Sequence, residues 1–329
     1  MTLLRKLSYL TVDWPLRQSR LFPQASPLIV EIGFGNGDYL IHLAETRPDC
    51  NLIGFEISSQ SMAKAEAKIE KRGLSNCRPI HCRAETALAH LLEPETVAEF
   101  HINYPDPWFK KRHQRRRLIQ RDTVDLLTSR LRAGGTLHLA TDILEYAEMA
   151  HDALASTPGL TNQFETPWVH DIEGRFRTKY EIKGYREGRR GHFFRYQRNA
   201  RPAPRPAVIK ELDMPHLFLQ SPLSAAEIVD RFEATRQQAD GAHIAILRAY
   251  ADPKRDTAVF EVVVEEPTIE QHALLVMSPR APAGEYMVKL SAVGHARSTA
   301  GMHRAVAAVG DLVAGLDAGS RVLARKLRE

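Results

Sequence analysis

Glycines and a carboxylate near the amino end form a pattern that could hold a small cationic ligand. The segment Glu31-Ile32-Gly33-Phe34-Gly35-Asn36-Gly37 follows an apolar run and precedes a helix-length amphipathic stretch. Glycines at such a turn permit tight turning and close approach of the backbone to a ligand. The spacing is not the Gly-x-Gly-x-x-Gly of a dinucleotide site, and an anionic Glu31 would repel a diphosphate. The pattern favours S-adenosylmethionine, which carries an ammonium and a sulfonium, over a merely structural turn.

A second carboxylate, Glu56, ends the next predicted strand at 51–56. A carboxylate in that place can accept hydrogen bonds from both hydroxyls of a ribose. Glu31, Gly33, Gly35, Gly37 and Glu56 are therefore candidate cofactor contacts.

The densest group of chemically useful residues is 103–110, Asn-Tyr-Pro-Asp-Pro-Trp-Phe-Lys. Two prolines flank Asp106, so its carboxylate is expected on a stiff loop. Trp108 offers a stacking face, and a run of cations follows it. These cations are Lys110, Lys111, Arg112, Arg115, Arg116, Arg117 and Arg121. The combination favours a nucleobase pocket beside a phosphate-binding surface; the alternative is a rigid surface loop with a solvated helix start.

Short apolar runs that alternate with amphipathic stretches position these residues. Strands are predicted at 27–32, 51–56, 77–82, 100–104, 136–141 and 193–198, and helices from the glycine loop to about 45, at about 59–71 and after 143. This order predicts an α/β fold with a doubly wound, mostly parallel sheet, in which ligands bind at the carboxyl ends of the strands.

The length of 329 residues is enough for about two domains. Three prolines in 200–206 predict a linker between a domain at 1–199 and a small α+β domain at 207–329. In the second domain we expect a helix that begins with a capping box at Ser224 and Glu227, four antiparallel strands near 242–250, 257–265, 271–278 and 285–293, and a last helix from about 299. Its role is either to help hold the substrate of the first domain or to mediate self-association.

The basic excess lies entirely in the first part of the chain. Residues 1–199 carry 29 Lys and Arg against 24 Asp and Glu, and residues 200–329 carry 16 against 16. A polyanionic partner such as nucleic acid becomes plausible. With no apolar run of membrane-spanning length, we expect a cytoplasmic protein that does not enter membranes. Three cysteines without metal-ligand spacing, and histidines 81, 101 and 138 in apolar runs, predict core residues and no metal.

Four motifs together resemble the bacterial tRNA (guanine-N7-)-methyltransferase family (TrmB type) over about residues 5–198. They are Glu-Ile-Gly-Phe-Gly-Asn-Gly, Asn-Tyr-Pro-Asp-Pro-Trp-Phe-Lys-Lys-Arg-His, Leu-Ala-Thr-Asp at 139–142 and Thr-Lys-Tyr-Glu at 178–181. The resemblance implies a Rossmann-like S-adenosylmethionine-dependent methyltransferase domain. The methyl group would go to N7 of a guanine in tRNA, at position 46 in the variable loop. Residues 200–329 have no counterpart in the usual short members.

The resemblance also implies roles for individual residues. Glu31 and Glu56 would bind S-adenosylmethionine, and Asp106 would lie beside the methyl-transfer site as cofactor contact and catalytic residue. The implied substrate contacts are Lys110, Asp142, Thr178, Lys179, Tyr180 and Glu181. Where the family places Asp or Asn beside the adenine, this chain has Cys82-Arg83-Ala84-Glu85. Either Glu85 takes that contact, or Arg83 leaves adenine recognition to backbone groups.

Other functions remain open at this stage. The chain could methylate another RNA, or be a non-catalytic tRNA-binding module, although the four carboxylates at 31, 56, 106 and 142 favour catalysis. An NAD-dependent oxidoreductase is disfavoured by the glycine spacing. Further phosphate contacts are predicted from the cations at the end of the first domain, namely Arg186, Arg189, Arg190, Arg195 and Arg198. The closing cations Arg321, Arg325, Lys326 and Arg328 favour a second domain that helps hold tRNA; the alternative is that they end a helix and are favourable partners for its negative end.

Overall fold

The computed structural model describes residues 7–110, 112, 116–202 and 206–328. The chain divides into two compact units, 1–209 and 210–329. Each unit contains its own sheet and its own hydrophobic core.

The first unit is built on a seven-stranded sheet in the order β3-β2-β1-β4-β5-β7-β6. Strands β1 to β5 pair in parallel, whereas β7 pairs antiparallel with both β5 and β6. The strands are β1 (Leu28–Ile32), β2 (Asn51–Glu56), β3 (Cys77–His81), β4 (Val97–Asn103), β5 (Leu131–Thr141), β6 (Leu160–Asn162) and β7 (His192–Arg198). The predicted fold class, a doubly wound and mostly parallel sheet, is confirmed.

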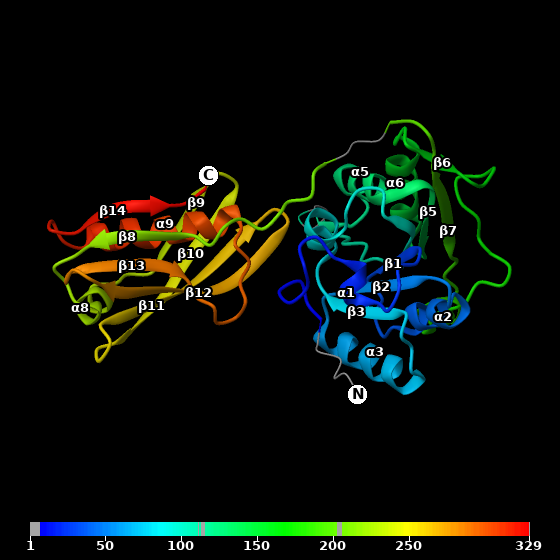
Figure 1. Ribbon diagram of the computed structural model, residues 1–329. Helices are drawn as coiled ribbons and strands as arrows, with labels where there is room; N and C mark the ends of the chain where they lie inside the picture. Colours follow the sequence, from blue (N-terminus) through cyan, green and yellow to red (C-terminus); the bar gives the residue numbers. More distant parts are fainter. Residues whose placement is uncertain (1–6, 111, 113–115, 203–205, 329) are drawn as a thin grey trace. The chain divides into compact units, whose positions relative to one another are not determined.

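Helices cover both faces of this sheet (Figure 1). The longer ones are α2 (Asp38–Thr46), α3 (Ser59–Arg72), α5 (Arg121–Arg130), α6 (Leu144–Ala155) and α7 (Lys179–Arg186). Shorter turns are α1 (Gln18–Leu21), α4 (Ala84–Thr86) and the π-helical turn η1 (Ala87–Leu91). Helices α2 and α3 pack on the face that carries Ile29 and Leu52, and α5, α6 and η1 pack on the opposite face. Each face is apolar because alternate strand residues point to it.

The strand order reverses between β1 and β4, which lie side by side at the centre of the sheet. The chain leaves β1 toward one edge and leaves β4 toward the other. This divergence opens a crevice beyond the carboxyl ends of the two strands, where ligands of such folds bind. The glycine loop at 33–37 and the Asp106 loop both begin there.

The predicted strands and helices of this unit all occur, with ends that differ by a few residues. Six elements lie outside those predictions: the short turns α1, α4 and η1, and α5, β6 and α7. The segment 156–178 has little regular structure and no clear hydrophobic period. Because periodicity is the signal for secondary structure, short elements in such a segment escape detection.

The second unit is an antiparallel sheet in the order β14-β8-β13-β12-β11-β10-β9. Its elements are β8 (His216–Gln220), α8 (Ala225–Asp230), β9 (Thr235–Ala239), β10 (Ala242–Asp252), β11 (Thr257–Glu266), β12 (Ile269–Arg280), β13 (Glu285–Leu290), α9 (Ala300–Gly315) and β14 (Arg321–Lys326). Side chains on β8 and on β10 to β13 alternate between buried and more exposed, and the buried ones pack against α9 and α8.

The four predicted strands correspond to β10 to β13, and the capping box at Ser224 and Glu227 begins α8. The alternative that the closing cations end a helix is wrong. Arg321 to Lys326 form strand β14 and do not end a helix. Arg325 pairs with Asp311 of α9, and Arg328 pairs with Asp213. Helix α9 stops at Gly315 and a turn precedes the strand, so these charges have no relation to a helix terminus.

Residues on each side of Lys210 belong to different units. The carbonyl of Pro206 accepts a hydrogen bond from the buried Arg130, and the backbone N–H of Ile209 donates to the carbonyl of Ala89. The unit boundary between 209 and 210 therefore falls three residues after the end of the predicted linker. In the described part of the chain no helix is long and apolar enough to cross a membrane.

Candidate functional site

A pocket of about 230 Å³ lies at the crevice between β1 and β4. Its walls come from three segments: the end of β1 with the glycine loop, the end of β4, and the start of α7. The lining residues are Glu31, Gly33, Phe34, Gly35, Asn36, Asp38, Tyr39, Asn103, Tyr104, Thr178 and Tyr180. The fold thus brings residues of the first, second and last of the four sequence motifs to one place.

The glycines of the loop have two different tasks. Gly33 and Gly35 have positive φ angles of 73° and 54°, and a Cβ on either would meet no atom within 4 Å. Their backbone therefore faces open space, as a ligand cradle requires. Gly37 begins α2, and a Cβ there would lie 2.8 Å from the Cβ of Ala65 on α3. Its position serves helix packing, and it is absent from the pocket lining.

Glu31 is 1% exposed at the pocket wall. Its Oε1 accepts a hydrogen bond from Asn103 at 3.1 Å, whereas its buried Oε2 has no partner among the described residues. Burial raises the pKa of Glu31 to about 8, against the lowering effects of the Asn103 hydrogen bond and of Arg175. A buried oxygen without a partner costs free energy, which a cationic ligand in the pocket would recover.

Glu56 acts on the glycine loop itself. Its Oε2 accepts the backbone N–H of Gly35 at 2.9 Å, and its Oε1 accepts those of Ile57 and Ser58 at 2.8 and 2.9 Å. Glu56 thereby fixes the shape of the cradle. A carboxylate offers about four lone-pair sites, so it can still accept one more hydrogen bond, such as one from a ribose hydroxyl.

The Asp106 loop begins with a strained residue. Tyr104 has a φ of 53°, unusual for a residue with a Cβ, and its buried hydroxyl has no partner in the described chain. Asp106 itself is exposed and is not part of the pocket lining. At the far end of the loop, the carbonyl of Pro107 accepts a hydrogen bond of 2.7 Å from Nε of Arg117.

The prediction that all seven cations after Trp108 bind phosphate is wrong for Arg117. This residue is 7% exposed and also contacts Glu145 and the sulfur of Met149. Arg116 lies over the ring of Trp108 at 5.4 Å, and Lys110 is exposed. Lys111 and Arg115 lie outside the described residues.

The cations predicted as phosphate contacts at the end of the first domain include both buried and exposed residues. Arg198 is 5% exposed and binds the carbonyl of Leu131 and the carboxylate of Glu95, so it is not available to RNA. Arg186 and Arg190 are exposed. A buried guanidinium that satisfies a carbonyl stabilises the fold and cannot reach a solvent-side phosphate.

The motif at 178–181 begins helix α7. The hydroxyl of Thr178 caps the helix by accepting the N–H of Glu181, and the Tyr180 side chain is 55% exposed. Glu181 is only 4% exposed and pairs with Arg175. The structure therefore turns Glu181 inward, although the resemblance implied a substrate contact. The side chain of Lys179 lies outside the described residues.

Asp142 and Glu85, the remaining predicted contacts, each face an arginine. Oδ2 of Asp142 lies 2.6 Å from Nη1 of Arg189, whose guanidinium also lies over the ring of Tyr180 at 5.6 Å. Oε2 of Glu85 lies 3.6 Å from Nε of Arg83. The two residues that compete for the adenine contact are thus partners of each other, and neither lines the pocket.

Two residues that the sequence analysis assigned to the core form part of a polar row on the sheet. Nε2 of His101 lies 3.1 Å from Glu99, its Nδ1 lies 3.2 Å from the hydroxyl of Tyr39, and its ring stacks on that of His138 at 4.6 Å. Burial lowers the pKa of both histidines, that of His138 to about 3.

The row also has the composition of a metal site. Glu99, His101 and His138 offer donor atoms within 4.8 Å of one another. Glu99 is engaged by Arg47 at 2.9 Å and by His101, and Nε2 of His138 lies 3.1 Å from the hydroxyl of Thr136. These contacts account for the three residues as a hydrogen-bonded support under Tyr39, which lines the pocket.

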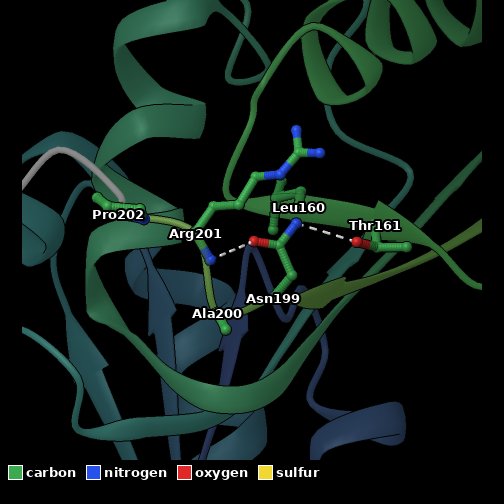
Figure 2. Close-up of a pocket in the computed structure, with 6 residues that line it drawn as sticks. All are labelled: Leu160, Thr161, Asn199, Ala200, Arg201 and Pro202. Carbon is green, nitrogen blue, oxygen red and sulfur yellow. Dashed lines mark hydrogen bonds between the residues drawn. The ribbon is translucent and has the colours of Figure 1, made fainter.

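A second, broader recess of about 590 Å³ lies beside β6 and the exit from β7. Asn199 ties this exit to β6 through hydrogen bonds to Thr161 and to the backbone of Arg201 (Figure 2). Arg201 is the one ionisable group among its described lining residues. The recess lacks the carboxylates and the glycine backbone of the smaller pocket, which is the better candidate site despite its smaller volume.

Sequence reasoning missed Arg175, which binds both Asn103 and Glu181. It also missed that Glu99, His101 and Asn103 share one face of β4. A signal for this was present, because the three polar residues alternate at every second position of an otherwise apolar strand. For Arg175 no local pattern exists, since its partners lie 72 and 6 residues away.

Comparison with known proteins agrees with this geometry. A family model described as "Putative methyltransferase" matches residues 25–193. A relative in Thermus thermophilus named tRNA (guanine-N(7)-)-methyltransferase is 35% identical over 213 residues, which cover 64% of this chain and 66% of the relative. A relative of the same name in Alkalilimnicola ehrlichii is 36% identical over 57% of this chain and 79% of its own.

A solved structure of an rRNA methylase from Streptococcus thermophilus matches with a TM-score of 0.38 and 14% identity, over 55% of this chain and 91% of that one. This TM-score and identity are too low to support a statement about function. The family model covers more than half of the chain and includes the whole pocket lining. The chain therefore belongs to this methyltransferase family.

Proposed function

We propose that this protein transfers a methyl group from S-adenosylmethionine to N7 of a guanine in tRNA. The observation that carries the proposal is the pocket at the β1/β4 crevice, which is lined by Gly33 and Gly35 and by Glu31, whose buried Oε2 has no partner among the described residues. The names of the relatives support the choice of tRNA and of guanine N7.

The pocket fits one end of S-adenosylmethionine. A volume of about 230 Å³ is smaller than the ~300–1,000 Å³ of typical small-molecule sites, so it suits the amino-acid part and not the whole molecule. Glu31 would hold the ammonium, and the open backbone of Gly33 and Gly35 would lie against the ligand. Glu56 would hold the ribose at the edge of the cradle. When bound, S-adenosylmethionine supplies an electrophilic methyl group on a sulfonium.

The chain's own task at the target base is alignment and charge stabilisation. Guanine N7 has an in-plane lone pair, so no proton has to be removed before it attacks the methyl carbon. Asp106 can accept hydrogen bonds from the N1–H and N2–H groups of guanine, which adenine cannot donate in this arrangement, and can offset the positive charge that develops on the ring. Pro105 and Pro107 and the bond from Arg117 limit the motion of this carboxylate.

Exposed aromatic residues beside cations make the same edge suitable for RNA. Tyr180 and Phe109 are 55% and 64% exposed, and Tyr185 is 37% exposed with Arg177 over its ring at 5.0 Å. Nucleobases stack on such rings while guanidinium groups bind phosphates. We propose that the protein acts in the cytoplasm, with tRNA as the partner that this surface binds.

A methyl-transfer assay tests the proposal. Purified protein is incubated with labelled S-adenosylmethionine and unmodified tRNA, and the modified base is located by chemical cleavage at 7-methylguanine. Label at guanine N7 supports the proposal. Transfer only to other RNA, or binding of tRNA without transfer, would contradict it and favour the two alternative functions. The protein with Glu31→Gln and Asp106→Ala together serves as the inactive control.

A further inference from the structure

Four residues form a continuous hydrogen-bonded chain from the start of α7 to the pocket carboxylate. Glu181 binds Nη1 of Arg175, and Nη2 of Arg175 donates to Oδ1 of Asn103 at 2.7 Å. Nδ2 of Asn103 then donates to Oε1 of Glu31 at 3.1 Å. None of these contacts lies within one regular element, so the chain joins three separate parts of the first unit.

Two aromatic rings and two hydrogen-bond acceptors fix the side chain of Arg175. Its side chain is 10% exposed, and its guanidinium lies 4.7 Å from the ring centre of Phe193 and 5.5 Å from that of Tyr39. Aromatic faces attract a guanidinium, and its planar fork fits two acceptors at once. Nη1 binds Glu181 and Nη2 binds Asn103, so the guanidinium of Arg175 has a single favoured orientation.

That orientation decides which way the Asn103 amide faces. An asparagine side chain carries a carbonyl on one side and an NH₂ group on the other. Since Arg175 donates hydrogen bonds only, it holds the carbonyl, and the NH₂ group must face Glu31. Without Arg175 the amide could turn over, and its carbonyl would then face the carboxylate with the same sign of partial charge.

We propose that Arg175 is a positioning residue for the methyl donor: it fixes Asn103, which holds Oε1 of Glu31 and so aims Oε2 into the pocket. Glu181 acts through Arg175 and does not touch the RNA. The inference rests on the proposed function only in naming S-adenosylmethionine as the ligand of Glu31. It assigns a role to Arg175, and it changes that of Glu181 from substrate contact to support.

The electrostatic surroundings of Glu31 make the proposal measurable. Arg175 and Asn103 favour its charged form, whereas burial and Glu56 oppose it. In the sheet Glu31 pairs with Gly54 on β2 and His101 on β4, and burial lowers the pKa of His101. From α2, Tyr39 lies between Arg175 and His101. Removal of the Arg175 charge should therefore raise the pKa of Glu31 further.

The test is a double-mutant cycle on ligand affinity. Binding of S-adenosylmethionine to the full-length protein is measured by calorimetry between pH 6 and 7.5 for Arg175→Gln, Glu31→Gln and the double variant. We expect Arg175→Gln to weaken binding about tenfold at pH 7 and to move the pH dependence upward by about one unit. In the Glu31→Gln background the same change should have little further effect, because coupled residues are not additive.

Arg72→Gln is the matched control, since Arg72 is about half exposed and pairs with Glu45 away from the pocket. It should leave affinity and pH dependence as in the parent. Arg175→Lys should not restore binding, because an ammonium cannot serve both acceptors in the same plane. If Arg175→Gln proves unfolded by its melting curve, Glu181→Gln, which keeps the guanidinium but releases it, takes its place in the cycle.

Additive effects of Arg175→Gln and Glu31→Gln would overturn the inference, and so would an Arg175→Gln affinity equal to that of the parent from pH 6 to pH 7.5. The outcome is separate from that of the proposed function. A parent protein that methylates tRNA while the cycle is additive keeps its function and loses this role for Arg175. A non-additive cycle in a protein that does not methylate tRNA leaves the role intact and refutes the choice of substrate.

Discussion

Binding of the methyl donor should depend on pH through Glu31. Burial raises the pKa of this carboxyl to about 8, so the protein without ligand holds a proton there at pH 7. The ammonium of the ligand pairs with the charged form only, and binding must release that proton. Below the pKa, each pH unit costs about 1.4 kcal/mol of binding free energy, so affinity should rise about tenfold from pH 6 to pH 7.

The variant Glu31→Gln removes the charge and keeps the shape. It should bind S-adenosylmethionine more weakly by about 1.5–3 kcal/mol, the loss expected for a hydrogen bond to a charged group. Its affinity should also be nearly constant between pH 6 and pH 7, because no group at this position titrates. Above pH 7.5 the ammonium of the ligand begins to lose its own proton, so the comparison belongs below that value.

The assay is calorimetry in two buffers with different enthalpies of ionisation. At pH 7 the difference in binding heat should correspond to release of about one proton in the parent and none in Glu31→Gln. The same proton count in both proteins would refute the assignment of the raised pKa to Glu31, and a parent that releases none would refute the raised pKa itself.

The raised pKa of Glu31 also affects the stability of the fold. Ligand binding needs the charged carboxylate, whereas the folded protein is more stable with the carboxyl protonated. A raised pKa in the folded state means that the folded protein holds more protons than the unfolded chain between about pH 4.5 and 8. Stability is therefore lost as pH rises through this interval. Glu31→Gln should melt at a higher temperature than the parent at pH 8.5 and show a smaller difference at pH 5, as measured by calorimetric scans. A melting temperature of Glu31→Gln below that of the parent at pH 8.5 would contradict the view that the charged Glu31 carboxylate destabilises the fold.

Three further predictions follow from the site and the unit boundary. Asp106→Ala should reduce single-turnover methyl transfer about a hundredfold or more with the affinity for S-adenosylmethionine unchanged, and transfer within a few-fold of the parent would exclude its catalytic role. Replacing Lys111, Arg112 and Arg115 by Gln should lower the slope of log K for tRNA against log salt by about three, whereas Arg117→Gln should lower the melting temperature instead. A chain shortened to residues 1–210 should still methylate tRNA. Its free energy of unfolding should exceed that of a chain ending at 199 by about 1–3 kcal/mol, because the shorter chain leaves Arg130 without the Pro206 carbonyl. Equal free energies of unfolding would refute this role of Pro206.

The elements that local pattern controls could be predicted from the sequence. Strands β1 and β2 are continuous apolar runs, and α3 has helical spacing and a capping serine at 58, so propensity, period and turn chemistry agree. Strand β14 fails this test. Its run Arg-Val-Leu-Ala-Arg-Lys has good helix formers and no clear alternation, and only pairing with β8 makes it a strand.

For the site, sequence reasoning placed the right motifs together but could not orient their side chains. Glu31, Gly33 and Gly35 line the pocket as the motif suggests. The resemblance implied that Glu181 contacts the substrate, and Arg198 appeared available to RNA because charged residues are usually exposed. The structure buries both, each against an opposite charge that lies elsewhere in the chain. Such pairs depend on tertiary contacts that no spacing rule encodes.

Arg117 is a further case in which a tertiary contact, and not the position in the sequence, decides what a charged residue does. Counted in a cationic run, it suggests one more phosphate contact. In the structure it holds the carbonyl of Pro107 and the carboxylate of Glu145, and so ties the Asp106 loop to α6. The prolines limit the backbone angles of the loop, but they do not attach it to the sheet or its helices. The position of Asp106, the proposed catalytic residue, therefore depends on Arg117, which belongs to the run that was expected to bind RNA.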